Sequence, residues 1–183
     1  MATTTNFGWT TPDNTGYVKD GALAIRTLGS AIDATAINFV DLTSSQTMAR
    51  KALTAPREIT TVSATAATGT INFDLLTQGV LYYTTNASAN FTLNFRGSGA
   101  ATLNSLMAVG DSISAVFLNT NGATAYHPTV FQIDGSAITP KWTNATAPTS
   151  GNVSSIDAYS FTIIKTAATP TFTVLAGGPV RFA

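Results

Sequence analysis

Charge is scarce in this sequence. Of its 183 residues only 10% are charged, and nine Lys and Arg balance nine Asp and Glu, against a usual charged share of about 25%. Small neutral side chains take their place, with 33 Thr, 28 Ala and 14 Ser. A neutral chain does not fit a protein held to nucleic acid by its charge, or a highly charged disordered chain. A surface with so few charges is poorly protected against association, which favours a chain built to be assembled.

Cysteine is absent and histidine occurs once. The first excludes disulfides, thiolate nucleophiles and thiolate metal sites, and the second leaves little zinc chemistry. Apolar runs are only a few residues long, far short of the roughly 20 that span a bilayer. Residues 1–11 lack a basic segment followed by an apolar run, so we expect no signal peptide. We expect no metal, no cofactor, no nucleic-acid partner and no membrane partner.

Residues 58–183 have the pattern of a β domain. Thr, Val, Ile, Phe and Tyr dominate, turn residues recur at short intervals, and no repeat of 20 to 50 residues is evident. A short helix is expected within residues 102–108. Short strands spaced about 10 residues apart predict a mainly β fold, an antiparallel β-sandwich of the jelly-roll type. The expected strands are 59–65, 70–74, 80–85, 90–95, 112–119, 129–134, 158–165 and 171–175.

Residues 1–57 differ from this body, because they carry half of all the charges. Val18, Ala22, Ile25, Gly29 and Ile32 are spaced 4, 3, 4 and 3 apart, with Leu28 on the same side. That spacing predicts one short helix with an apolar seam. Its start has cap candidates at residues 13–15, and residues 36–57 have weak patterning. We therefore expect an N-terminal arm and helix for attachment and oligomerisation, followed by the β domain.

Two aromatic residues stand out in the arm. Phe7 and Trp9 are its only large anchors, and aromatic side chains dominate interface energetics. They dock on another chain in one interpretation, and Trp9 packs on the helix of its own chain in the other. The residues expected to serve attachment or oligomerisation are Phe7, Trp9, Val18, Ile25, Leu28 and Ile32.

Nothing in the spacing forms a catalytic constellation. His127 precedes a proline, and no acid is tied to it by sequence, although a triad needs a nucleophile and an orienting acid. Glycoside hydrolysis needs two facing carboxylates. The body offers Glu58, Asp74, Asp111, Asp134 and Asp157, of which Asp111 and Asp134 lie in turns, where aspartate usually bonds its own backbone. We expect a protein that is not an enzyme.

Sugar binding without hydrolysis stays open. Tyr82, Tyr83, Tyr126 and Trp142 can form an aromatic platform, and Trp142 lies in a loop rich in Pro, Thr and Asn. Trp142 and Tyr126 are the candidate ligand-facing residues. In the alternative, these rings belong to the core and Trp142 caps it, as aromatic side chains in sandwiches usually do.

Two stretches resemble parts of known proteins. Residues 8–14 (GWTTPDN), 18–22 (VKDGA) and 25–33 (IRTLGSAID) resemble an N-terminal module of tailed-phage structural proteins, often tail fibres. Residues 62–74, 82–97 and 161–166 resemble a module of phage virion proteins, notably those of marine cyanobacteria.

The resemblance implies a non-enzymatic virion component, homo-oligomeric and often trimeric. Its partners would be copies of itself and other virion proteins of the tail, baseplate or capsid, with a host surface glycan as a further ligand. A tail fibre or tail appendage attached through its N-terminal segment is the main expectation. A capsid decoration protein and a host-glycan-binding module are the alternatives.

Overall fold

The computed structural model describes residues 2–12, 17–36, 55, 57–169 and 171–183. It divides into two units, Met1–Thr54 and Ala55–Ala183, and each is described by itself. Of the sequence-based expectations, the cap candidates at residues 13–15 and most of the segment 36–57 lie outside the described residues. Within the residues that the structure describes, no helix is long and apolar enough to cross a membrane.

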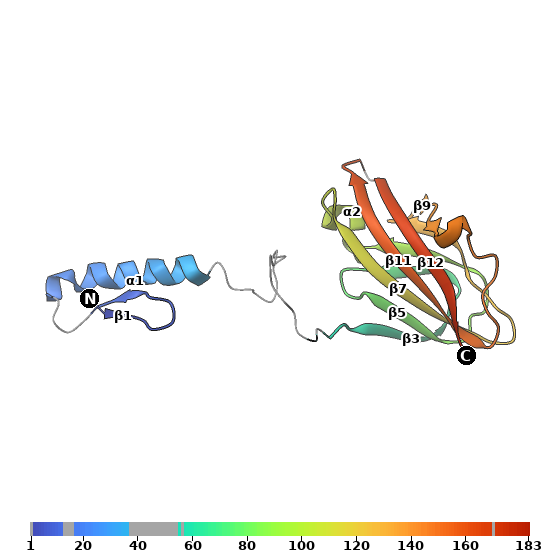
Figure 1. The fold of residues 1–183 in the computed structure, drawn as a ribbon, viewed down its shortest axis with the longest axis horizontal. Helices are drawn as coiled ribbons and strands as arrows, with labels where there is room; N and C mark the ends of the chain where they lie inside the picture. The colour runs from blue at the N-terminus through green and yellow to red at the C-terminus, as the bar shows by residue number, and fades with distance from the viewer. Residues whose placement is uncertain (1, 13–16, 37–54, 56, 170) are drawn as a thin grey trace. The chain divides into compact units, whose positions relative to one another are not determined.

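The first unit is a hairpin packed on a helix (Figure 1). Strands β1 (Ala2–Thr3) and β2 (Thr10–Thr11) pair antiparallel. A 3-10 turn, η1 (Val18–Asp20), leads into helix α1 (Gly21–Ala36), so the predicted helix is confirmed and extends four residues past Ile32. The indole Nε1 of Trp9 donates a 3.1 Å hydrogen bond to Thr35 Oγ1 and joins the hairpin to the helix.

The second unit contains all eight strands expected from the sequence; seven match to within three residues, and the last, expected at 171–175, extends to Phe182. Its first strands alternate between two sheets along the chain, and its later strands form one long hairpin with short additions. The strands are β3 (Thr60–Ala66), β4 (Gly69–Asp74), β5 (Val80–Thr85), β6 (Phe91–Arg96), β7 (Ser112–Asn121), β8 (Pro128–Ile133), β9 (Ser136–Ile138), β10 (Lys141–Trp142), β11 (Ser155–Ala167) and β12 (Thr171–Phe182).

The sheets are mixed, so the mainly β prediction is confirmed, while the antiparallel pairing expected for a jelly roll is wrong for the parallel pairs among β3 to β8 and for β10, which pairs parallel with β12. The six-stranded sheet has the order β10-β12-β11-β7-β5-β3, and the four-stranded sheet has the order β4-β6-β8-β9. Strands β3, β5 and β7 are mutually parallel, as are β4, β6 and β8. Strand spacing alone does not reveal this, because a connection that crosses to the second sheet has the length of a hairpin loop.

Three strand pairs, β3–β4, β5–β6 and β7–β8, each place one strand in either sheet and stack in parallel. We call each pair a coil. Thr60 lies beside Val80 and Gly69 beside Phe91, which sets the first two coils 20 and 22 residues apart. The coils therefore stack although no repeat is evident in the sequence. The third coil is harder to recognise because residues 97–111, including helix α2 (Leu103–Leu106), are inserted before it.

Antiparallel strands follow the third coil in each sheet. In the six-stranded sheet β11 pairs antiparallel with β7, and β12 pairs antiparallel with β11. In the four-stranded sheet β9 turns back along β8. Figure 1 shows β3, β5, β7, β11 and β12 side by side in that order.

The core lies between the two sheets and is rich in aromatic side chains. Phe95 of the four-stranded sheet meets Phe161 of the six-stranded sheet edge-on, with ring centroids 4.9 Å apart. Phe91 and Phe117 make a second contact between the sheets at 5.5 Å. All four rings are at least 98% buried, and truncating one such ring to alanine costs about 3–5 kcal/mol.

Helix α2 confirms the short helix expected within residues 102–108, and charged side chains hold both of its ends. The carboxylate of Asp134 accepts hydrogen bonds from the backbone N–H groups of Leu103 and Asn104, at 2.7 and 3.0 Å. The ammonium of Lys165 donates to the carbonyl oxygens of Asn104 and Met107, at 2.8 and 2.7 Å. These contacts fix the inserted segment to the turn after β8 and to β11.

Candidate assembly surfaces

Helix α1 has two apolar sides, and the hairpin covers one of them. Thr35 and Leu28 are half-buried on the side that meets the hairpin. The rest of the predicted seam lies on a neighbouring side, where Ile25 is 65% and Ile32 42% exposed. The expectation that Leu28 lies on the side of Ile25 and Ile32 is therefore wrong. Ala22 and Gly29, which complete the seam spacing, are exposed as well. The structure thus leaves an apolar stripe, defined by Ala22, Ile25, Gly29 and Ile32, on the surface of the first unit.

The two aromatic anchors lie in the hairpin. Their rings stack on each other with centroids 4.9 Å apart and an interplanar angle of 14°. Trp9 is half-buried and bonds Thr35 of α1, which is the own-chain packing named as the alternative. Phe7 stays 54% exposed beyond it. Val18 begins the 3-10 turn before α1, and its side chain lies outside the described residues.

Trp142 packs on the core from the edge of the six-stranded sheet. Its ring meets the buried rings of Phe131 at 5.5 Å and Phe161 at 6.4 Å, both edge-on. This is the capping position of the alternative interpretation. The ring nevertheless separates two open depressions of about 390 and 360 Å³ and lines both.

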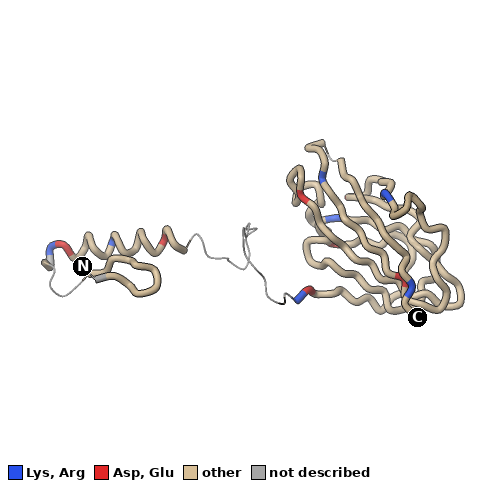
Figure 2. Tube along the Cα trace, in the orientation of Figure 1, with Lys and Arg blue, Asp and Glu red and all other residues tan. Residues whose placement is uncertain are grey.

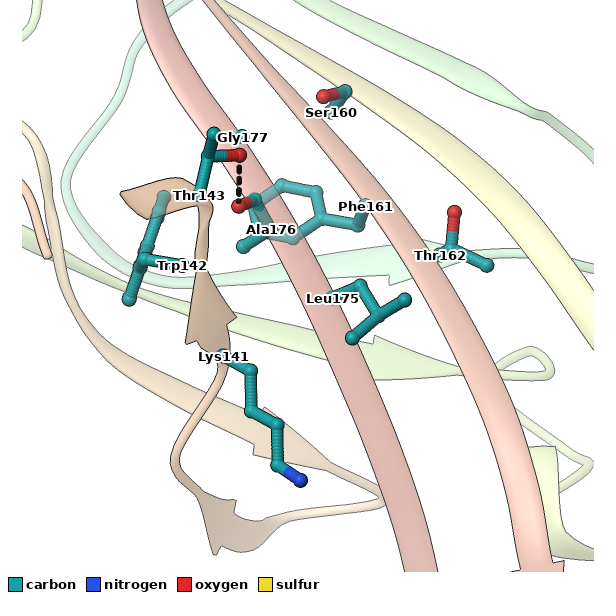
Figure 3. Close-up of a pocket in the computed structure, with 9 residues that line it drawn as sticks. All are labelled: Lys141, Trp142, Thr143, Ser160, Phe161, Thr162, Leu175, Ala176 and Gly177. Atoms are coloured by element: carbon teal, nitrogen blue, oxygen red, sulfur yellow. Dashed lines mark hydrogen bonds between the residues drawn. The ribbon is translucent and has the colours of Figure 1, made fainter. Parts of the chain in front are cut away.

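Figure 3 shows the first depression, between β10, β11 and β12. The hydroxyls of Ser160 and Thr162 lie along β11, and Thr143 donates a 3.2 Å hydrogen bond to the carbonyl of Ala176. The second depression is lined mainly by apolar residues of β8, β9 and the following loops, including Pro140. The two depressions differ in polarity, so Trp142 lies between a hydroxyl-lined and an apolar surface.

The other candidate tyrosines belong largely to the body. Tyr126 is half-buried against the core, and its backbone N–H donates to Asn121 Oδ1 at 3.0 Å. Tyr83 meets the ring of Phe117 at 5.8 Å, and burial raises the pKa of its phenol. Tyr82 is half-buried on the opposite face of β5. The structure does not bring Tyr126, Tyr82 and Trp142 together into one platform.

A buried polar network, not foreseen from the sequence, lies at one end of the six-stranded sheet. The carboxylate of Asp157 is fully buried and accepts hydrogen bonds from the backbone N–H of Asn152 and from the side-chain amides of Asn121 and Asn152, at 2.7–3.1 Å. Asn119 donates to Asn121 Oδ1 at 3.1 Å. The signal in the sequence is the alternation of β7, which places Asn119 and Asn121 in line with inward-facing Phe117.

Two titratable side chains adjoin this network. Burial, with a smaller contribution from the Asp157 carboxylate, raises the pKa of the Tyr159 phenol well above its usual value. Burial lowers the pKa of His127 below its usual 6.5, and Asp157 opposes that shift. Both rings are therefore neutral near pH 7, which agrees with a structural role for them.

The other aspartates of the body are engaged in structural contacts. Asp74 forms an ion pair with Arg96 of the next coil, at 2.5 Å. Asp111 accepts from the backbone N–H of Ala108 within its own turn, at 2.8 Å, and Asp134 caps α2. Among the described residues, no group of three or more His, Asp or Glu side chains is placed to hold a metal ion.

Comparisons of the chain with protein-family models, with curated proteins and with solved structures find no match.

Proposed function

We propose that this chain is a non-enzymatic structural protein of a bacteriophage particle, a tail-fibre or tail-appendage component that assembles as a homotrimer. Residues 1–57 attach the protein and bring its copies together, and residues 58–183 form the projecting β body. The resemblance of residues 8–33 to a tail-fibre module supports the identity of the particle.

The observation that carries the proposal is the apolar stripe on α1. Ile25 and Ile32 are exposed although the same helix already packs its neighbouring side on the hairpin. A spacing of 3, 4 and 3 residues from Ala22 to Ile32 is the pattern with which helices associate. Exposed isoleucines in so regular a row are costly in water, so contact with helices of other copies supplies the burial that one copy lacks.

Self-association is tested on the purified full chain by measuring its mass in solution. The proposal expects a trimer and expects Ile25→Asp to weaken it. Leu23→Asp is the matched control, because Leu23 is 62% exposed on the same helix but lies off the stripe. A monomeric wild-type chain, or equal losses in the two variants, would contradict the role of the stripe.

Attachment is tested by deleting residues 1–17 and measuring incorporation into particles. This deletion removes the hairpin with Phe7 and Trp9 and leaves α1 in place. We expect the truncated chain to keep its oligomeric state and lose incorporation. Retained incorporation would favour a capsid decoration protein that binds through a face of its body.

Trp142 supports a second candidate, a host-glycan-binding module. The ring separates two depressions, one of which is lined by the hydroxyls of Ser160 and Thr162. Trp142→Phe keeps an aromatic ring against Phe131 and Phe161, whereas Trp142→Ala removes it. Glycan binding predicts that both variants lose host adsorption while Trp142→Phe stays folded; unchanged adsorption by Trp142→Phe would remove this candidate.

A further inference from the structure

The six-stranded sheet has two free edges, and the strand register places them level with each other. Strand β3 is one edge, with only β5 beside it. At the other side β12 pairs with β11 along its length, while β10 covers it only at Leu175 and Ala176. Within the described residues, the end of β12 from Val180 to Phe182 has no strand on its outer side. The sheet therefore has a second free edge there.

Strand pairing sets these two edges level with each other. Val62 lies beside Tyr82, Tyr82 beside Leu118, Leu118 beside Ala158, and Ala158 beside Val180. Paired residues share a face of the sheet, so these five apolar side chains form one row across its outer face. We call it the cross-sheet row. Its two ends, Val62 and Val180, are 61% and 56% exposed, whereas its three middle members are half-buried.

The directions of the strands also match. Strands β3, β5 and β7 are parallel, β11 runs opposite to β7, and β12 runs opposite to β11. Hence β12 points the same way as β3. A second copy placed beside the first can therefore add its β3 to the free end of β12 as a parallel strand. The neighbouring coils of one chain also pair in parallel.

Strand β10 and the 3-10 turn η2 (Thr143–Ala145) after it cover only part of this edge. Lys141 and Trp142 pair with Leu175 and Ala176, and Thr143 donates to the Ala176 carbonyl and lies near Gly177, which stands level with Thr60, the first residue of β3. A neighbouring β3 would therefore pair with β12 beyond Gly177, at Val180 to Phe182. The regular part of β3, Thr60 to Ser63, precedes the irregularity in its pairing with β5.

The edge on β3 also lacks most of the usual protection against pairing. Natural edge strands carry lysine, proline or inward charges that discourage association. Strand β3 has the sequence TTVSATA, without charge or proline. Figure 2 shows no charged residue along it after the Arg and Glu that precede it. The exposed side chain of Ile59, 68% accessible, adds apolar area at its start.

We propose that copies of this chain join head to tail through these edges, so that the free end of β12 in one copy pairs with β3 of the next and the cross-sheet row continues from Val180 to Val62. Such a contact uses two different surfaces and closes into a ring when the rotation between copies allows it. The inference deepens the proposed homotrimer and rests on its self-association, with the body contributing to the interface.

Cysteine cross-linking tests this arrangement cleanly, because the chain has no cysteine of its own. The full-length double variant Val62→Cys/Val180→Cys is treated with a short bismaleimide. Four strand spacings of about 4.8 Å separate the two positions within one copy, about 19 Å, so a reagent of shorter reach links only different copies. We expect covalent dimers and trimers from the double variant and monomers from either single variant.

The matched control is Val62→Cys/Val130→Cys. Val130 is an exposed valine, 43% accessible, on β8, which has neighbouring strands on both sides. It should give no comparable linkage. Equal linkage in the control would mean that tethering through the first unit, not edge pairing, brings the bodies together. Covalent dimers of a single-cysteine variant would mean that the same position of two copies meets in a two-fold contact. Either result overturns the head-to-tail arrangement.

The mass of the untreated protein separates the two levels of the proposal. An oligomer whose double variant yields only monomers on cross-linking refutes the edge contact and leaves the proposed function standing. A monomer in solution refutes both.

Discussion

The side-chain amide of Asn94 donates a 2.8 Å hydrogen bond to the side-chain oxygen of Asn72, the residue directly beside it in the neighbouring coil. Gln132 occupies the same place in the third coil. The Asn94 oxygen in turn accepts from the backbone N–H of Gly135, at 2.9 Å. The bond between Asn72 and Asn94 thus joins the first two coils on the face of the four-stranded sheet opposite the core.

Asn94→Ala should destabilise the second unit by about 1–3 kcal/mol, because it leaves the Gly135 N–H without its acceptor in a partly buried site. Asn94 is only 8% exposed. Asn72→Ala is the comparison, since Asn72 is exposed and accepts a single bond; its cost should stay below about 1 kcal/mol. Urea unfolding followed by circular dichroism measures both, and equal costs would contradict the central place of Asn94.

Lys165→Met should cost about 1.5–3 kcal/mol, because a buried charged donor to two carbonyl groups is lost. The carbonyls of Asn104 and Met107 would then have no donor from β11. Lys141→Met, at an exposed lysine, should change stability by less than about 0.5 kcal/mol. Hydrogen exchange at residues 103–107 supplies a local measure, and unchanged protection there in Lys165→Met would count against the pinning of α2.

Gly151→Ala should destabilise by about 1–3 kcal/mol through overpacking. A methyl group at this position would lie 2.6 Å from the carbonyl oxygen of Tyr126 and 2.8 Å from the Asp157 carboxylate. Gly99→Ala is the control, because the nearest atom to its methyl group would be the Arg96 guanidinium at 3.8 Å. The melting temperature should fall in Gly151→Ala and stay near the wild-type value in Gly99→Ala. A Gly151→Ala protein as stable as wild type would show that the Asp157 network accommodates the methyl group without loss of stability.

The stability of the body should fall as the pH drops below 6.5, before the carboxylates titrate at about 4. Burial lowers the pKa of His127 in the folded chain, so the unfolded chain binds a proton that the folded chain resists, and unfolding becomes easier on acidification. His127→Gln cannot titrate and should flatten that part of the curve. Denaturant midpoints measured between pH 7.5 and 5 test this; a wild-type and variant that lose stability in parallel would assign the effect to another group.

Eight of the ten strands that the structure describes in the second unit could be predicted from the sequence, and their pairing could not. Alternation of apolar side chains, as in Phe91, Leu93 and Phe95, marks a strand facing a core whatever lies beside it. Strand direction depends on whether a connection returns along the same sheet or crosses to the other sheet, and loop length does not distinguish the two. The Ala67–Thr68 link, which crosses from β3 to β4 in the other sheet, is as short as a hairpin loop. The stacking of the coils is evident only from the strand register, which sets Ile71 beside Leu93 and Leu93 beside Phe131.

The helix of the first unit was predictable, but which of its sides meets the hairpin was not. Both the stripe with Ile25 and Ile32 and the side with Leu28 have helical spacing. The choice depends on the bond from Trp9 to Thr35, a contact between residues 26 positions apart. Trp142 was similarly ambiguous, because a tryptophan in a polar loop serves equally well as a cap on Phe131 and as an exposed ring. The Asp157 network was missed because asparagine and aspartate usually indicate turns.

Parallel stacking makes the length of the body adjustable. The first two coils repeat after 20 residues in the six-stranded sheet, and each coil contacts only its neighbours, as in other stacked architectures. An inserted coil would add one strand to each sheet and extend the domain by about 4.8 Å. It would keep β3 as the first edge and β12 as the last. Gaining or losing a segment of this size would thus change the width of the body with no redesign of either terminus.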